Sequence, residues 1–149
     1  MHKKCNSGLN AATGDWIKVI ASDDLLLPAS VDKNISVVKA NNSKIIFSYY
    51  TQFTEQEGRK LFKKTKPDAK EEILFFKKNS DQQFETLLTQ SFNISPASFF
   101  HRSIFEEVGL FDERYRYLED LPFWLKITKS GITFKLMEET TVLYRIGND

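Results

Sequence analysis

The fold of this chain is decided by residues 14–28, which read GDWIKVIASDDLLLP. A largely apolar run at residues 16–21, rich in β-branched side chains, predicts a buried strand rather than an alternating surface strand. Two adjacent carboxylates, Asp23 and Asp24, follow the carboxyl end of that run. Like charges side by side must be solvated, paired or bound to a cation. The pair therefore has two interpretations: a Mg²⁺ or Mn²⁺ site at the edge of an α/β sheet, or a turn that helps to cap the next helix.

Size and composition indicate one ordinary domain. With 149 residues, 41% hydrophobic content and 13 phenylalanines, the chain can fill a sizeable core. The formal net charge of +1 gives no global field, so we expect no nucleic-acid partner. A single cysteine, Cys5, allows no intrachain disulfide, and no apolar signal region or long apolar run is visible. We therefore expect a cytoplasmic protein in which residues 1–149 form a single domain.

The rest of the chain alternates between helical and strand patterns, which predicts an α/β fold. Apolar residues recur at helical spacing after Pro28, and residues 44–53, rich in Ile, Phe and Tyr, predict a second strand. Residues 54–80 are dense in charge, and we expect a charged loop or excursion there. Further helices are expected at 81–92, 102–109 and 121–131, and further strands at 93–101, 132–136 and 140–146.

A second acidic pair, Glu119 and Asp120, stands at the start of a predicted helix, where the helix dipole favours negative charge. A carboxylate in this position can act as a general base, or it can simply stabilise the helix. Arg116 and Tyr117, just before the pair, could line a polyhydroxylated or anionic ligand or belong to a solvated turn. Trp124 has two interpretations as well, a core anchor or a stacking platform for a ligand.

Taken together, these segments resemble glycosyltransferase family 2 with the GT-A fold. Residues 6–28, NSGLNAATGDWIKVIASDDLLLP, resemble the central block of that family, in which a small-residue helix leads into a strand, an Asp-x-Asp-type motif and a proline. Residues 99–131, FFHRSIFEEVGLFDERYRYLEDLPFWLKITKSG, resemble its acceptor-side block, and residues 142–146, VLYRI, match the strand that follows. Because order and separation agree over nearly the whole chain, the resemblance implies a partial GT-A fold, a mixed sheet flanked by helices.

The resemblance also implies a reaction and a role for each acidic site. Such enzymes transfer a sugar from a nucleotide-diphosphate sugar to a glycan or lipid-linked acceptor with inversion, usually in bacterial surface polysaccharide synthesis. Asp24 would bind a divalent cation, Mn²⁺ or Mg²⁺, that bridges the donor diphosphate. Asp120 would be the general base for the acceptor hydroxyl, and Glu119 would support the acceptor or the base. The residues implied to contact substrate are Asp23, which faces the ribose or the sugar, Arg116, Tyr117 and Trp124.

The chain departs from the family pattern in two respects. Gly147 stands where many relatives carry a histidine that completes the metal shell, which weakens the expected cation site. The βαβ units that hold the nucleotide have no counterpart in residues 1–149, so the resemblance implies the C-terminal portion of the domain. An alternative therefore stays open, a non-catalytic remnant or acceptor-binding module. The incomplete sheet also predicts self-association or a complementing chain, and a lipid-linked acceptor implies peripheral association with the inner face of the membrane.

Overall fold

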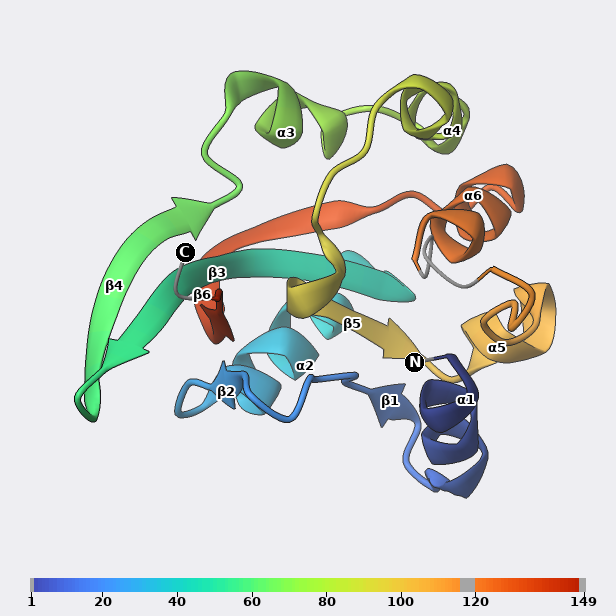
Figure 1. Cartoon of the computed structure of the whole chain (residues 1–149). Helices are drawn as coiled ribbons and strands as arrows, with labels where there is room; N and C mark the ends of the chain where they lie inside the picture. Colours follow the sequence, from blue (N-terminus) through green and yellow to red (C-terminus); the bar gives the residue numbers. More distant parts are fainter. Residues whose placement is uncertain (1, 116–119, 148–149) are drawn as a thin grey trace.

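The computed structural model describes residues 2–115 and 120–147, which form one mixed sheet with helices packed against it (Figure 1). The strands are β1 Trp16–Ile17, β2 Leu25–Leu26, β3 Ile45–Gln56, β4 Arg59–Lys66, β5 Ser98–His101 and β6 Lys135–Arg145. The helices are α1 His2–Ala11, α2 Ser30–Asn41, α3 Lys70–Phe75, α4 Ser80–Thr89, the 3₁₀ turn η1 Ser95–Ala97, α5 Ser103–Val108 and α6 Leu121–Lys129. The six-stranded sheet has the order β1-β5-β3-β6-β2, and β4 pairs with β3 outside this path. The prediction of an α/β fold with a mixed, helix-flanked sheet is confirmed.

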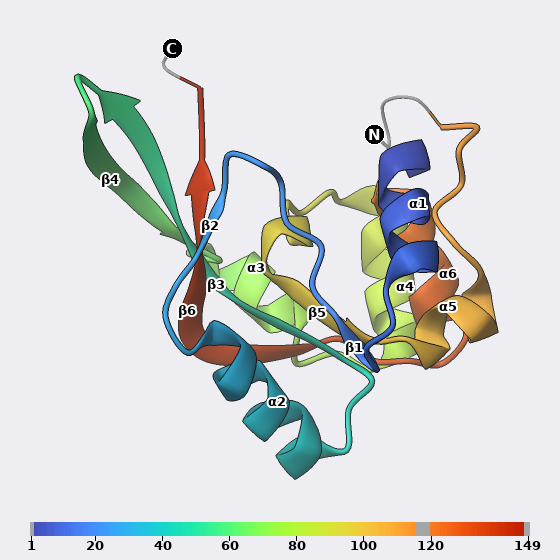
Figure 2. The ribbon, with the colours of Figure 1, turned by 90° about the horizontal axis from the view of Figure 1, so that it is seen from below.

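β3 forms the centre of the sheet and separates two apolar clusters. It pairs parallel with β6 and antiparallel with β4 and β5. Ile45 and Phe47 belong to a cluster with Trp124 of α6, whereas Ile46 belongs to a second cluster with Val38 of α2. Since successive side chains of a strand point to opposite faces, consecutive buried residues show that both faces of β3 are covered. Figure 2 shows α2 apart from α4, α5 and α6, on the other side of the sheet.

Three of the strand predictions are wrong in their extent. The strand predicted at 16–21 is limited to β1, which pairs antiparallel with β5 at the edge of the sheet. Beyond it, the Lys18 ammonium rather than the backbone ladder contacts the neighbouring η1–β5 segment. The strands predicted at 132–136 and 140–146 are the single strand β6, because it follows β3 through register shifts near Tyr49 instead of turning back.

The charged stretch at 54–80 contains the end of β3, the strand β4 and the helix α3. The loop alternative of the prediction is therefore wrong, whereas a projecting hairpin is an excursion. β4 follows β3 through a tight turn in which Glu57 and Gly58 have φ values of 50° and 74°. Positive φ at both central residues is what a two-residue hairpin turn of type I′ requires. The side chains of β4 are exposed along nearly its whole length. No apolar alternation therefore marked β4 as a strand, and its charge favoured the loop interpretation.

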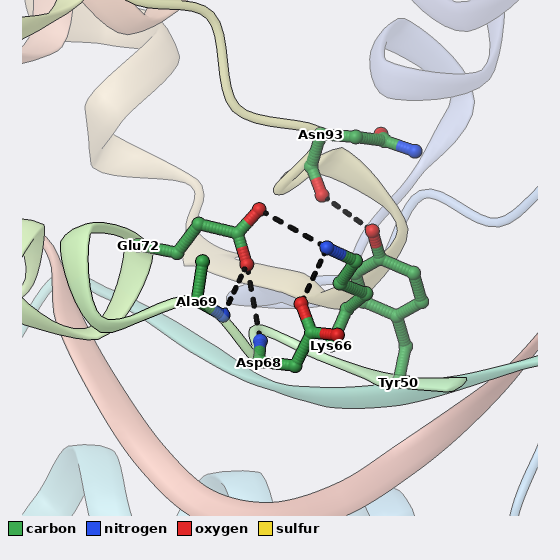
Figure 3. A network of polar contacts seen from close by, with 6 residues as sticks. All are labelled: Tyr50, Lys66, Asp68, Ala69, Glu72 and Asn93. Atoms are coloured by element: carbon green, nitrogen blue, oxygen red, sulfur yellow. Dashed lines mark hydrogen bonds and ion pairs between the residues drawn. The ribbon is translucent and has the colours of Figure 1, made fainter.

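The base of the β3–β4 hairpin is fastened to α3 and to the segment before η1 (Figure 3). The Glu72 carboxylate accepts a hydrogen bond from the backbone N–H of Asp68 at 3.0 Å. Lys66 Nζ lies 2.5 Å from an Asp68 carboxylate oxygen and 3.4 Å from one of Glu72. The Tyr50 hydroxyl donates to the Asn93 carbonyl at 2.8 Å. The hairpin thus has an anchored base, while its outer part projects beyond the body of the protein (Figure 2).

The part of the chain that the structure describes contains no helix long and apolar enough to cross a membrane. Its longest helix, α2, has 12 residues and carries Asp32 and Lys33 within them. About 20 predominantly apolar residues are needed for a helical span.

Candidate active site

One pocket brings together acidic side chains that lie far apart in the sequence. It has a volume of about 400 Å³ and is lined by Asp23, Asp24 and Asp120. Trp124 and Ile20 contribute to its largely apolar wall. The pocket therefore combines the two acidic sites that the sequence singled out. A concave, mostly apolar site with a few convergent polar groups is the usual form of a ligand-binding or catalytic site.

Three of the predicted site residues, Arg116, Tyr117 and Glu119, fall outside the described residues. Their roles stay predictions. Asp120 follows Glu119 directly and begins the described segment that carries α6. Trp124 lies within that helix.

The Asp24 side chain is buried and hydrogen-bonded, whereas the Asp23 side chain is exposed. Asp24 is 8% exposed, and its Oδ1 accepts the backbone N–H of Arg145 at 2.8 Å, which ties it to the end of β6. Burial is the main cause that raises the pKa of Asp24, and the Asp23 charge adds to it. The Arg145 hydrogen bond and the Lys18 charge oppose this shift. Neither carboxylate caps α2, since Ala29 occupies the N-cap position without a side-chain capping bond.

Lys18 supports this site from outside the pocket lining, a role that sequence reasoning missed. Its ammonium donates hydrogen bonds to the backbone carbonyls of Pro96 and Ser98, the latter at 3.0 Å. Burial lowers the pKa of Lys18 to about 7, and the negative charge of Asp24 opposes that shift. Lys18 therefore holds the segment that carries Asp23 and Asp24 against η1. Its partners lie 78 and 80 positions away, so no local pattern marks them.

Asp120 is held by a side chain from η1 rather than by its own helix. It occupies the N-cap position of α6, where its carbonyl accepts the N–H groups of Phe123 and Trp124 at 3.0 and 2.9 Å. Its side chain makes no capping hydrogen bond. The carboxylate accepts a hydrogen bond from Ser95 Oγ, and Ser95 lines the same pocket. A hydrogen bond of this kind fixes a carboxylate in one orientation, as a general base requires.

Trp124 belongs to the core and to the pocket wall at once. Its side chain is 3% exposed and packs edge-on against Phe47 and Phe134, with ring centroids 5.4 and 5.6 Å away. The core-anchor interpretation is therefore confirmed. Within the described segments its indole Nε1–H has no hydrogen-bond partner. A buried N–H beside a pocket can donate a hydrogen bond to an oxygen atom of a ligand.

The turn at 109–113 is clamped from the other end of the chain by Asn6. Asn6 Nδ2 donates to the Phe111 carbonyl at 2.9 Å and to the Glu113 carboxylate at 3.0 Å, and Asn6 Oδ1 accepts the Phe111 N–H at 3.1 Å. In the same turn, the hydrogen-bonded Arg114 guanidinium holds the pKa of Asp112 well below its usual range. These contacts position the turn that leads towards Asp120.

The residues present fit a divalent cation in part. Asp23 and Asp24 offer the hard oxygen ligands that Mg²⁺ and Mn²⁺ prefer. In residues 2–115 and 120–147, no group of three or more His, Cys, Asp or Glu side chains could hold a metal ion. Gly147, at the position of the expected histidine, offers no side-chain ligand. A cation here would therefore need oxygen atoms from a bound diphosphate and from water.

Comparison with known proteins identifies the family of this chain. The sequence pattern of "Glycosyl transferase family 2" matches residues 2–109, which include Asp23, Asp24 and Ser95. The chain belongs to glycosyltransferase family 2. The prediction of the family is confirmed, and transfer of a glycosyl group is the activity associated with it.

Two curated relatives carry the name of uncharacterized glycosyltransferases. One, from Methanocaldococcus jannaschii, is 24% identical over 143 residues, which cover 96% of this family 2 chain and 46% of the relative. The other, from Rickettsia typhi, is 25% identical over 125 residues, which cover 83% of this chain and 37% of the relative. The chain thus spans less than half the length of both relatives.

The family 2 chain is also similar to a solved glycosyltransferase, S. aureus TarS. The structure of TarS 1–349 in complex with UDP-GlcNAc superimposes with a TM-score of 0.68 at 15% identity, over 100% of this chain and 40% of the TarS 1–349 chain. The complex of TarS with UDP gives a TM-score of 0.66 at 16% identity, over 98% and 40% of the two chains. Since TarS has the GT-A fold, the predicted GT-A fold is confirmed.

Proposed function

We propose that this chain carries the cation-binding and acceptor-activating residues of an inverting glycosyltransferase. The donor is a nucleotide-diphosphate sugar, and the acceptor is a hydroxyl group of a glycan or a lipid-linked sugar. The observation that carries the proposal is the single pocket lined by Asp23, Asp24 and Asp120. Carboxylates at a cation site and at a base site are what displacement of a diphosphate by a hydroxyl needs.

In the proposed reaction Asp120 takes the proton of the acceptor hydroxyl. The acceptor oxygen forms a bond to the anomeric carbon as the bond from that carbon to the diphosphate oxygen breaks, so direct displacement inverts the anomeric centre. Ser95 orients the Asp120 carboxylate through its hydrogen bond. Glu119 supports the acceptor or the base, and Arg116, Tyr117 and Trp124 contact the substrates. All four of these roles rest on the family resemblance.

Asp24 and Asp23 would hold a divalent cation, Mn²⁺ or Mg²⁺, together with the donor diphosphate. When bound, such a cation stabilises the negative charge that develops on the leaving diphosphate. Asp24 is fixed by Arg145, so it presents its second oxygen from a defined position. Asp23, which is exposed at the pocket, supplies the adjacent carboxylate and would face the ribose or the sugar.

The proposed donor is supported by the fold of TarS, which was solved with UDP-GlcNAc and with UDP. Because this chain covers 40% of the TarS 1–349 chain, donor binding would need a nucleotide-binding part as well, within one polypeptide or as a complementing chain. We further propose action at the cytoplasmic face of a membrane, in surface polysaccharide synthesis, without a nucleic-acid partner.

The test compares Asp120→Asn with Asp112→Asn in the enzyme that combines this chain with its nucleotide-binding part. Asp120→Asn keeps the shape and can still accept from Ser95, but it removes the proton acceptor. We expect kcat to fall by about 10²–10⁴-fold with little change in the donor KM. Asp112 is a matched control because it is paired with Arg114 and does not line the pocket.

A kcat near the wild-type value for Asp120→Asn would contradict the assignment of the base. If the wild-type enzyme instead binds an acceptor oligosaccharide but transfers no sugar from any nucleotide sugar, the alternative of an acceptor-binding module holds. Initial rates with both substrates varied separate these outcomes.

A further inference from the structure

The outer part of the β3–β4 hairpin concentrates positive charge that the fold does not use. β4 has the sequence RKLFKKTK, and its first seven residues are exposed. In the described part of the chain, no ion pair involves Arg59, Lys60, Lys63 or Lys64. Lys66 differs, because it is paired with acidic groups at the anchored base of the hairpin (Figure 3). These four cations face water or a partner.

The hydrogen-bonded pairing of β3 with β4 is interrupted at Lys63 and Lys64, two of these cations. Thr51 pairs with Thr65 and Phe53 pairs with Phe62, so β4 has one residue more than β3 between these pairs. The extra residue forms a bulge that contains Lys63 and Lys64. Bulges bend an edge strand and re-aim its side chains.

Apolar side chains are exposed among the cations. Leu61 is 39% exposed and Phe62 is 59% exposed. Lysines on an edge strand have an ordinary explanation, since they discourage pairing with another strand. An exposed phenylalanine on an edge strand favours association instead of preventing it. Protection of the edge against strand pairing therefore explains the lysines but not Phe62. Cations interleaved with apolar side chains are instead the composition of segments that lie at the surface of an anionic membrane.

The β3–β4 hairpin also lies close to the pocket. Arg145, at the end of β6, forms an ion pair with Glu55 of β3, and its backbone N–H binds Asp24 at the pocket. The hairpin therefore leaves the body next to the end of β6, where Arg145 holds Asp24 of the candidate cation site (Figures 1 and 2). A surface held by β4 would lie near the mouth of the pocket, where a lipid-linked acceptor is needed. This last step rests on the proposed function, whereas the binding itself does not.

We propose that the β4 patch, defined as Arg59, Lys60, Leu61, Phe62, Lys63 and Lys64, binds the surface of a lipid bilayer with anionic headgroups. The cations attract the headgroups, and Phe62, the more exposed of the two apolar side chains, enters the interface, while Leu61 points to the other face of the hairpin. Charge complementarity is local, because the whole chain has a net charge of only +1. Glu57 at the hairpin turn and Glu55 reduce the patch charge in part.

The test is co-sedimentation of the chain with vesicles of phosphatidylcholine alone or mixed with phosphatidylglycerol, without donor or acceptor. We expect binding to the mixed vesicles only, and weaker binding as salt is raised. Each basic residue near an anionic surface contributes about fivefold in affinity, so Lys63→Gln with Lys64→Gln should weaken binding by about 25-fold. Phe62→Ser should also weaken it while salt dependence persists.

The matched control is Lys39→Gln with Lys129→Gln, which removes the same charge from exposed positions in α2 and α6. This control should bind as the wild type does. Equal loss in the control and in the β4 variant, equal binding to phosphatidylcholine alone, or no binding to either vesicle overturns the proposal. Stronger binding to a DNA duplex than to the mixed vesicles also overturns it, in favour of a nucleic-acid partner.

The outcome is separable from the proposed function. Vesicle binding by the Asp120→Asn variant should equal that of the wild type. If Asp120→Asn loses glycosyl transfer but keeps vesicle binding, both proposals are supported. If the wild type binds vesicles but transfers no sugar, the proposed enzymatic function is refuted and the proposed membrane binding is not.

Discussion

Raising the pH from about 7 to about 9 should stabilise the folded chain through the deprotonation of Lys18. Burial lowers the pKa of Lys18 from 10.5 to about 7 in the folded protein, although the charge of Asp24 opposes this. The unfolded chain keeps the ordinary value and so binds more protons across this window. Stability rises with pH wherever the unfolded state binds more protons.

The size of the effect follows from the two pKa values. Each pH unit in which only the unfolded state holds the proton adds up to about 1.4 kcal/mol to the free energy of unfolding. Folded Lys18 is about half protonated at pH 7, so the total gain from about pH 7 to about pH 9 is about 2 kcal/mol. Tyr50 acts outside this window, because burial raises its pKa and its destabilising contribution begins above its ordinary value of 10.0.

Urea denaturation at several pH values measures the effect. Lys18→Met should flatten the pH dependence, even if the loss of its hydrogen bonds to Pro96 and Ser98 lowers the stability at every pH. Lys39→Met, at an exposed position, should keep the wild-type slope. A wild-type slope of zero, or the same slope in Lys18→Met, would refute the assignment of a buried ammonium.

A second observable isolates the pairing with Asp24. Because the Asp24 charge raises the pKa of Lys18, Asp24→Asn should lower that pKa further. NMR of the labelled lysine side chain follows the Lys18 titration directly. An unchanged Lys18 titration in Asp24→Asn would mean that the two groups do not interact.

Two further predictions concern the cation site and the clamp on the acidic turn. Mn²⁺ should bind weakly without nucleotide, because the described residues supply no third acidic or histidine ligand. Asp23→Asn and Asp24→Asn should each weaken Mn²⁺ binding further. Identical calorimetric titrations of the wild type and both variants would leave the acidic pair a structural role. Asn6→Ala removes three hydrogen bonds to the turn at 111–113 and should cost about 2–3 kcal/mol in urea denaturation, whereas Asn10→Ala, exposed on the same helix, should cost little. A cost for Asn6→Ala no greater than for Asn10→Ala would count against the clamp.

The elements that could be predicted from the sequence are those in which buried apolar side chains recur with a regular spacing. β3 has apolar residues on both faces, and α2 and α4 have apolar residues at helical spacing, so each was predicted close to its observed place. β4 was missed because almost none of it is buried. The signal that could have found it is the turn pair Glu57 and Gly58 between Phe53 and Phe62, which face each other across the hairpin.

The identity of the acidic residues was predictable, but what holds them was not. Asp23, Asp24 and Asp120 stand out because charge follows or precedes an apolar element. Asn6 contacts the turn at 111–113 across 105 and 107 positions, and Lys18 contacts η1 across 78 positions and the start of β5 across 80. Such pairings depend on how the strands are ordered in the sheet. A single sequence does not determine that order by local pattern.

The short turn η1 explains how two acidic sites keep one geometry. Ser95 Oγ binds the Asp120 carboxylate, while the Pro96 carbonyl next to it accepts from Lys18, whose charge acts on Asp24. The turn is closed on itself, since Ser98 Oγ donates to the Ser95 carbonyl at 2.8 Å. A shift of η1 would therefore move the contacts of both sites at once. The distance between the proposed base and the proposed cation site is thus set by backbone that belongs to neither, which makes the turn as important to the pocket as the carboxylates themselves.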